Sequence, residues 1–342
     1  GMDAHSRNSY FVVMNKRGRV LRRERVATTE EELIRFIKSV RGKRCLTFEE
    51  GGLSQWLYLL LKDRVDELVV CNPVKNKRRT GAKTDFRDAM ELADLLRVNR
   101  LHGVYHSADK FMELRIAVSG YDDLVSDLVR AKNRYKALFR QTAILVPGSE
   151  LYRDPSFINE LPLETQRYVA EPLFEQISLL MKNKAAYIKR FESNQKKYKE
   201  IRLISSIPGF GAVMSNQVVG ILVTPYRFST KYNLFSYAML VKHKQISDGR
   251  VYGKKGVPGR RDLKGIFKSA ALAALRTNNS FQRKYYEMQS LGSTEKAARN
   301  AVARRLAATV LGVWKSGKKY NDRYLEVKRR QQRHRATQDL QA

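Results

Sequence analysis

The sequence has few of the residues that mark secreted, metal-chelating or membrane-spanning proteins. Its 342 residues include only two cysteines, Cys45 and Cys71, and both lie in apolar, strand-like runs. We therefore expect reduced core thiols in a cytosolic protein, and neither a disulfide nor a zinc site. The five histidines are scattered without metal-ligand spacing. Neither a long apolar run nor a signal peptide appears, which argues against a membrane as the partner.

Acidic residues are scarce relative to basic ones. Lys and Arg number 66 against 34 Asp and Glu, and the formal net charge is +32. Solubility does not require such an excess. It predicts a polyanionic partner, and nucleic acid fits better than the alternative, an anionic membrane surface. The length allows two or three domains with a sizeable core.

The first hundred residues alternate between strand-like and helix-like patterns. A β-hairpin is predicted over residues 9–26, with its turn at 15–18. Thr29 and Glu32 have the spacing of a capping box, which predicts that a helix begins there.

Two short buried strands are predicted next, over residues 44–48 and 67–71. The helix between them is expected to include Trp56 in its core face. A basic loop over 75–83 then leads into a further helix. This order of elements is typical of an α/β domain whose strands feed helices on both sides.

That further helix carries a pair of carboxylates at its start. Asp85 and Asp88 are three residues apart and share one face, where the N-terminus of a helix favours negative charge. The pair is either a solvated helix cap or half of a site for a hard divalent cation.

Two more carboxylates occupy informative positions. Asp3 precedes the hairpin, and only two residues come before it, so the first strand is expected to be short. Glu49 ends a central strand, where open α/β sheets bind their ligands, and it fits the register better than the alternative Glu50. Convergence of Asp3, Glu49, Asp85 and Asp88 would suit two Mg²⁺ ions that stabilise both oxygens of a phosphoryl displacement.

From residue 108 to about 199 the pattern is that of two long amphipathic helices, broken at Pro147-Gly148. Each carries an apolar stripe that has to be buried. Pairing between chains and an intramolecular helical hairpin both achieve this, and the sequence leaves the two possibilities open.

The segment Ile207-Pro-Gly-Phe-Gly211 joins two helical segments and has the pattern of a helix-hairpin-helix. Its glycines, Gly209 and Gly211, would let backbone N–H groups approach a phosphate closely. The alternative is a purely structural tight turn.

Residues 242–264 are rich in glycine, lysine and arginine, which predicts a mobile basic loop suited to phosphates. Ser247 is the only serine in this loop, and the flanking cations could hold a scissile phosphate. Helices are expected again from Phe267 and from Thr294, followed after Lys315 by a basic tail. The residues expected to contact nucleic acid are Lys75, Lys77, Arg78, Arg79, Lys83, Gly209, Gly211, Lys242, Lys244, Arg250, Lys254, Lys255, Arg260 and Arg261.

These motifs together resemble the DEDD transposases of bacterial insertion sequences, a group that includes the Piv-type DNA invertases. The most specific segment, Lys83-Thr-Asp-Phe-Arg-Asp-Ala89, resembles the family's K-T-D-x-x-D-A block. The other segments that carry the resemblance are Asp3 with Asn15-Lys-Arg-Gly18, Phe48-Glu-Glu-Gly-Gly52, Ile207-Pro-Gly-Phe-Gly211, Ser247-Asp-Gly249 and Gly259-Arg-Arg-Asp-Leu-Lys264.

The resemblance implies a ribonuclease-H-like N-terminal domain of the Holliday-junction-resolvase type, with Asp3, Glu49, Asp85 and Asp88 holding Mg²⁺, or Mn²⁺ in its place. It implies long helices for dimerisation and a C-terminal domain with Ser247 as nucleophile. The expected domains are 1–107, catalytic; 108–199, coiled coil; 200–316, transposase; and 317–342, basic tail.

The resemblance also implies a function. A cytoplasmic, nucleoid-associated bacterial recombinase would cleave and rejoin double-stranded DNA through a transient phosphoserine link, as a homodimer or tetramer guided by a structured RNA. Two alternatives remain open. One is a resolvase-like nuclease in which Ser247 is a bystander, and the other is a non-catalytic nucleic-acid-binding relative.

Overall fold

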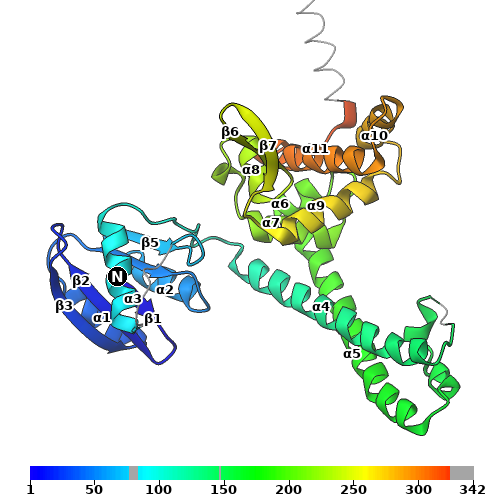
Figure 1. Ribbon diagram of the computed structural model, residues 1–342, viewed down its shortest axis with the longest axis horizontal. Coiled ribbons are helices and arrows are strands. Elements are labelled where there is room, and N and C mark those ends of the chain that lie inside the picture. The colour runs from blue at the N-terminus through cyan, green and yellow to red at the C-terminus, as the bar shows by residue number, and fades with distance from the viewer. Residues whose placement is uncertain (77–83, 146–147, 324–342) are drawn as a thin grey trace, which may run out of the picture. The chain divides into compact units, whose positions relative to one another are not determined.

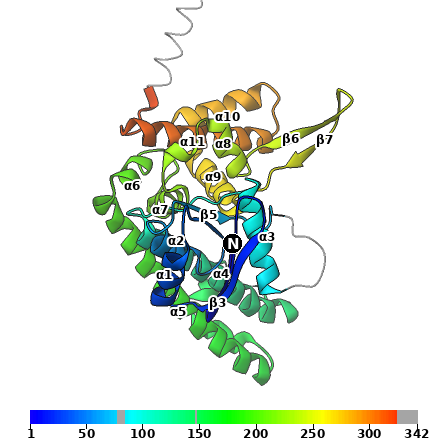
Figure 2. The same ribbon diagram turned by 90° about the vertical axis from the view of Figure 1, so that its left-hand side faces the viewer.

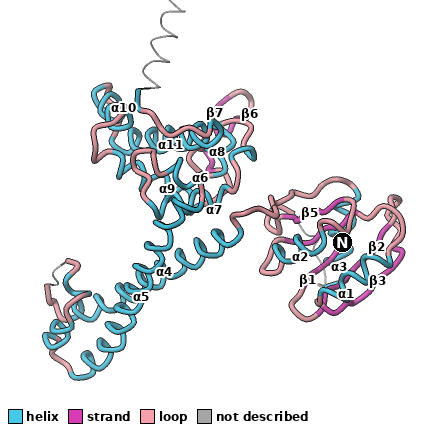
Figure 3. Tube along the Cα trace, turned by 180° about the vertical axis from the view of Figure 1, so that it is seen from behind, coloured by secondary structure: helices cyan, strands magenta, loops and turns pink. Residues whose placement is uncertain are grey.

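The structure is a computed structural model that describes residues 1–76, 84–145 and 148–323. The chain divides into two compact units, one over Gly1–Asp109 and one from Lys110 onward (Figure 1). The first unit combines strands with helices, and the described part of the second is almost wholly helical apart from one hairpin (Figure 3). Among the described residues, none of the helices is long and apolar enough to span a bilayer.

Three strands form an antiparallel sheet in the first unit. The strand β1 (Met2–Ala4) pairs with β2 (Asn8–Met14), which pairs with β3 (Val20–Ala27). The side-chain oxygen of Asn15 accepts from two backbone N–H groups of the turn that joins β2 to β3. The hairpin predicted over residues 9–26 is confirmed. The first strand is short, as expected, but Met2 is fully buried within it.

The remaining strands and three helices complete this unit. Strands β4 (Cys45–Glu49) and β5 (Glu67–Cys71) are parallel, and β1 also lies against β4. The capping residue of the first helix is Thr29, whose side chain accepts from the Glu32 N–H as predicted. The helices are α1 (Glu30–Ser39), α2 (Ser54–Leu61) and α3 (Asp85–Arg97), and α3 packs against β1, β2 and β4.

Two side chains in this unit differ from the sequence prediction. Leu57, Leu60 and Leu61 form the buried face of α2, so the preceding Trp56 falls outside that face and is 38% exposed. Cys45 begins β4 and is exposed, while Cys71 is buried at the end of β5. The expectation that both cysteines lie in the core was therefore wrong for Cys45, because it stands at the exposed start of the strand and the buried stretch begins only at Leu46.

Two long helices open the second unit. The helix α4 (Met112–Gln141) packs along α5 (Glu164–Lys197), and Figure 1 shows the pair extending from the other helices of the unit. Tyr135 and Phe139 are fully buried against α5 and the connecting segment. The apolar stripes are thus covered within one chain, in an intramolecular helical hairpin. Association of two chains through the outer faces of this hairpin stays a prediction.

The helices α6, α8, α9 and α10 pack against α11, whose buried side chains belong to the core of this unit. The near end of the α4–α5 hairpin shares this core, because Leu114 and Val118 join the same apolar cluster. The helix α10 had no counterpart in the sequence prediction. The elements are α6 (Lys199–Ile204), α7 (Ala212–Leu222), α8 (Lys231–Tyr237), β6 (Lys242–Ser247), β7 (Arg250–Gly256), α9 (Arg261–Ala274), α10 (Ser280–Ser290) and α11 (Glu295–Ser316).

The segment expected to be a mobile basic loop is a two-stranded hairpin, β6–β7. Its turn residues, Asp248 and Gly249, both have positive φ, at 48° and 71°. An Asp-Gly pair in this conformation matches the right-handed twist of two antiparallel strands. The prediction of a loop was wrong because the abundance of glycine and charge does not prevent strand pairing once the Asp248-Gly249 turn brings the two strands together.

Gly209 is held in a tight turn between α6 and α7. Its φ is +90°, and a Cβ there would overlap the carbonyl oxygen of Ala270 on α9. Ile207 and Phe210 on either side are buried. The absence of a side chain at Gly209 therefore lets the turn lie against the backbone of α9.

We expect Gly209→Ala to lower the free energy of unfolding by about 2–4 kcal/mol, because the strained φ and the steric overlap add. Gly211→Ala is the matched control. Gly211 has a φ of −83°, and a Cβ added there would meet nothing within 4 Å, so its substitution should have little effect. Urea unfolding of both variants measures the difference. Equal stabilities would show that the turn relaxes without cost.

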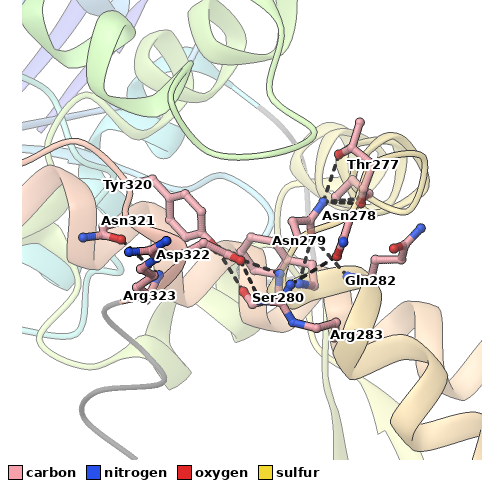
Figure 4. A network of polar contacts seen from close by, with 12 residues as sticks. Thr277, Asn278, Asn279, Ser280, Gln282, Arg283, Tyr320, Asn321, Asp322 and Arg323 are labelled. Atoms are coloured by element: carbon pink, nitrogen blue, oxygen red, sulfur yellow. Dashed lines mark hydrogen bonds and ion pairs between the residues drawn. The ribbon is translucent and has the colours of Figure 1, made fainter.

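The start of the expected basic tail is packed against α10. Figure 4 shows Tyr320 and Asp322 beside the turn at Ser280. The Ser280 N–H donates to Asp322 Oδ1 at 2.9 Å, and the Arg283 guanidinium donates to Asp322 Oδ2 at 2.6 Å. The ring of Tyr320 stacks on Phe281. Residues 317–323 thus belong to the folded unit, and the rest of the expected tail lies outside the described residues.

Burial opposes ionisation of Asp322, but hydrogen bonds from Tyr320, Ser280 and Arg283 outweigh it and lower the pKa to about 2. A depressed carboxyl pKa stabilises the fold above the unfolded pKa and loses that effect as the pH falls through the folded pKa. We expect Asp322→Asn to cost about 1 kcal/mol at pH 7, a value reduced for solvent screening.

The difference between wild type and Asp322→Asn should shrink as the pH falls from about 4 to about 2. Thermal unfolding across this range measures it. Asp127→Asn is the control, because Asp127 pairs with Arg130 on an exposed face of α4, where ion pairs contribute little. A cost for Asp322→Asn that does not change with pH would contradict the assignment.

Candidate active site

The carboxylates predicted to form a site come from three elements of the first unit. Asp3 lies in the middle of β1, opposite Tyr10 of β2. Asp85 and Asp88 lie in the first turn of α3, whose N-cap Thr84 accepts from the Arg87 N–H. Glu49 ends β4. The helix α3 packs against both β1 and β4.

Asp3 and Asp85 meet at a residue that the sequence did not single out, His5. Its Nε2 atom is 3.2 Å from Asp3 Oδ2 and 3.5 Å from Asp85 Oδ1. One ligand atom from each of these three residues lies within 4.8 Å of the others, the one such group found in the described part of the chain. Glu49 and Asp88 do not belong to this group of three.

His5 was missed because its importance comes from β1 facing α3, and no spacing within the sequence predicts that contact. The only local signal was its position two residues after Asp3. In an extended strand, residues i and i+2 point to the same side.

The site concentrates negative charge. Burial raises the pKa of Asp3, His5 lowers it, and the charges of Asp88 and Asp85 raise it further. The influence of Asp88 on Asp3 shows that this carboxylate is also near, and its residue is only 9% exposed. A cation bound between these groups would relieve their mutual repulsion.

Glu49 and Glu50 have different surroundings. Glu49 lies opposite Cys71 in the parallel pair β4–β5. Burial raises the pKa of the Cys71 thiol to about 11, and the nearby Glu49 charge contributes. The carboxylate of Glu50 contacts the ring of His106, whose other nitrogen contacts Gln55. Glu50 is thus engaged with the segment that follows β5, whereas Glu49, the last residue of β4, stays the residue predicted for the site.

Ser247 lies in the second unit, at the end of β6 and beside the turn of the hairpin. It is exposed and pairs across the hairpin with Arg250. Its hydroxyl has no hydrogen-bond partner among the residues that the structure describes. Figure 2 shows the hairpin extending away from the helices of its unit. Because the hydroxyl is exposed and flanked by cations, a phosphodiester bound at the hairpin could reach it.

The cations predicted to contact nucleic acid divide into three groups. Lys77, Arg78, Arg79 and Lys83 lie outside the described residues, while Lys75 is exposed. Arg260 forms a hydrogen-bonded ion pair with Asp262, which leaves it less free for a phosphate. The remaining cations are exposed in or near the β6–β7 hairpin: Lys242, Lys244, Arg250, Lys254, Lys255 and Arg261.

Comparison with known families finds a transposase match in each of the two units. A transposase model of the IS110 DEDD type matches residues 1–144, which contain all four predicted carboxylates. The model described as "Transposase IS116/IS110/IS902 family" matches residues 201–287, which contain Ser247. The chain belongs to the DEDD transposase family of insertion sequences. A search of curated proteins finds no match to this transposase.

Membership of this family establishes a transposase or recombinase function, with DNA as a partner. DEDD-type transposases generally use divalent metal ions. The donor set fits such an ion, because two carboxylates and an imidazole approach one another closely beside a third carboxylate. Asp3, His5 and Asp85 would hold it, with Asp88 adjacent.

Proposed function

We propose that this transposase cleaves and rejoins DNA strands through Ser247, with the carboxylates of the first unit holding Mg²⁺. The observation that carries the proposal is the position of Ser247, exposed beside the turn of a cationic hairpin within the region that matches a transposase family. Such a position lets a phosphodiester reach the hydroxyl while cations neutralise the phosphate.

The reaction conserves the number of phosphodiester bonds. Ser247 Oγ forms a bond to phosphorus while the bond from phosphorus to a deoxyribose oxygen breaks, and the serine proton ends on that oxygen. A sugar hydroxyl of a second strand then attacks the phosphoserine, and the proton returns to Ser247. Because the energy of the bond is kept in the covalent link, no external energy source is needed.

The residues of the first unit have a supporting role in this scheme. A bound divalent ion would supply charge stabilisation to the transferring phosphoryl group. Asp3, His5 and Asp85 would hold it, and Glu49 and Asp88 would complete the tetrad. We take the fold of this unit to be ribonuclease-H-like, since an antiparallel β1-β2-β3 sheet lies beside a parallel β4–β5 pair.

The assembly is also proposed. A dimer or tetramer would bring two DNA ends together, and the exposed outer faces of α4 and α5, including Ile116 and Leu179, are candidate contacts. A structured guide RNA would explain part of the charge of +32.

A denaturing gel tests the proposed chemistry. The protein is incubated with Mg²⁺ and end-labelled DNA from its element, with and without the flanking non-coding RNA. A protease-sensitive band in which protein and DNA are covalently joined is the expected product, and RNA dependence of the band would support a guide. Free cleaved ends without such a band would favour hydrolysis by water.

The second candidate function is a metal-dependent, resolvase-like nuclease. One observation favours it: the carboxylate and histidine group is formed wholly within the first unit, without any residue of the Ser247 hairpin. Such a group could direct a water molecule at a phosphodiester by itself.

A further inference from the structure

A groove lies at the base of the β6–β7 hairpin, bounded by the hairpin, α9 and α11. Its apolar floor includes Met239, Leu240 and Val257, and its walls are basic. The groove encloses about 660 Å³. A water molecule occupies about 30 Å³, so the space is far larger than a single bound ion requires.

The helices contribute cations at a spacing that places them on one face. Lys264 and Lys268 are four residues apart on α9, as are Lys296 and Asn300 on α11, and Arg304 follows one turn later. Residues at i and i+4 are neighbours on a helix surface. Because α9 packs against α11, the two rows line the same groove.

The hairpin contributes a third row. Lys244 lies directly opposite Lys254 in the β6–β7 ladder, and Lys242 is two residues from Lys244 on the same strand. Like charges directly opposite each other destabilise a strand pair. The hairpin, α9 and α11 therefore place repelling charges together.

Nothing in the described part of the chain neutralises these charges. The nearby carboxylates are already used, since Asp262 pairs with Arg260 and Glu295 pairs with Arg299. Ion pairs to described residues are lacking for all six lysines of the groove: Lys242, Lys244, Lys254, Lys264, Lys268 and Lys296. An extended anion would compensate a cluster of this kind.

We propose that this groove, which we call the α9–α11 groove, binds the phosphate backbone of duplex DNA. Lysines are point charges that contact phosphates without reading bases, so the groove would position DNA rather than select its sequence. The choice of DNA rests on the transposase function, but binding is independent of the serine chemistry. The groove would hold DNA next to the hairpin that carries Ser247.

The test is fluorescence anisotropy with labelled duplex DNA and no divalent metal, so that binding is measured without cleavage. The double variant Lys268→Gln/Lys296→Gln removes one exposed cation from each helix. Its affinity should fall about tenfold or more near physiological salt. The slope of log affinity against log salt should become shallower by about 2, near 0.9 for each lost phosphate contact.

Lys182→Gln/Lys189→Gln is the control, since it removes the same charge from exposed positions of α5. An equal loss in this control would show that only total charge matters and would overturn the proposal. The same titration is run with duplex RNA of the same length. If the Lys268→Gln/Lys296→Gln variant loses affinity for this RNA but not for DNA, the choice of DNA is overturned. Circular dichroism should show both variants folded, because the substituted side chains are exposed. Ser247→Ala separates this proposal from the proposed chemistry. That variant should lose the covalent band but keep its affinity for DNA.

Discussion

Ser247→Ala is expected to abolish the covalent protein–DNA product and to lower strand transfer by about a thousandfold or more, because it removes the attacking atom. The hairpin should survive the change. Its turn depends on Asp248 and Gly249, and the Ser247 hydroxyl has no partner among the described residues. DNA binding should therefore stay close to wild type, so that the loss falls on the chemical step.

The measurement is the rate of covalent band formation at saturating DNA. Ser269→Ala is the matched control, since Ser269 is an exposed serine on α9 in the same unit. Cleavage that continues unchanged in Ser247→Ala would support the water-dependent nuclease. If binding is retained by every variant and no cleavage occurs with the authentic element ends, the non-catalytic alternative gains support.

Asp85→Asn should have the second largest effect. The substitution keeps the size of the side chain but removes a charge from the group formed with Asp3 and His5. We expect divalent-metal affinity to fall by about 10–100-fold or more, since even residues that only support a metal ligand have effects of that size. Cleavage and strand transfer should fall together.

Binding of Mn²⁺ to the protein without DNA, followed by electron paramagnetic resonance, measures this affinity apart from activity. Asp94→Asn is the control, because Asp94 lies on the same helix but pairs with Arg97. His5→Gln adds information about the third member of the group. An imidazole ligand favours Mn²⁺ over Mg²⁺, so its loss should reduce the preference for Mn²⁺.

Unchanged Mn²⁺ affinity in Asp85→Asn would place the metal elsewhere and would contradict the assigned site. A loss in Asp94→Asn as large as that in Asp85→Asn would show that the effect is one of general charge on α3. Thermal unfolding of each variant without metal separates loss of a ligand from loss of structure.

Much of the local structure was predictable because its causes are local. The Thr29 and Thr84 caps begin their helices, and the strand pattern of residues 9–26 forms the expected hairpin. The errors have local explanations too. The buried face of α2 is formed by Leu57, Leu60 and Leu61 and leaves Trp56 outside it, and the Asp248-Gly249 pair forms a hairpin turn within a segment whose composition is typical of a loop.

The sequence by itself determined the family and the excess of positive charge, and it named the carboxylates and the serine as candidates, because each depends on residue type and short spacing. Only the tertiary structure decided that His5 stands between Asp3 and Asp85, that Gly209 lies against α9, and that lysines of α9, α11 and the hairpin line one groove. These contacts join different elements of the fold, such as Asp85 with His5 and α9 with Gly209. Their geometry follows from how helices and strands pack, which no spacing along the sequence records.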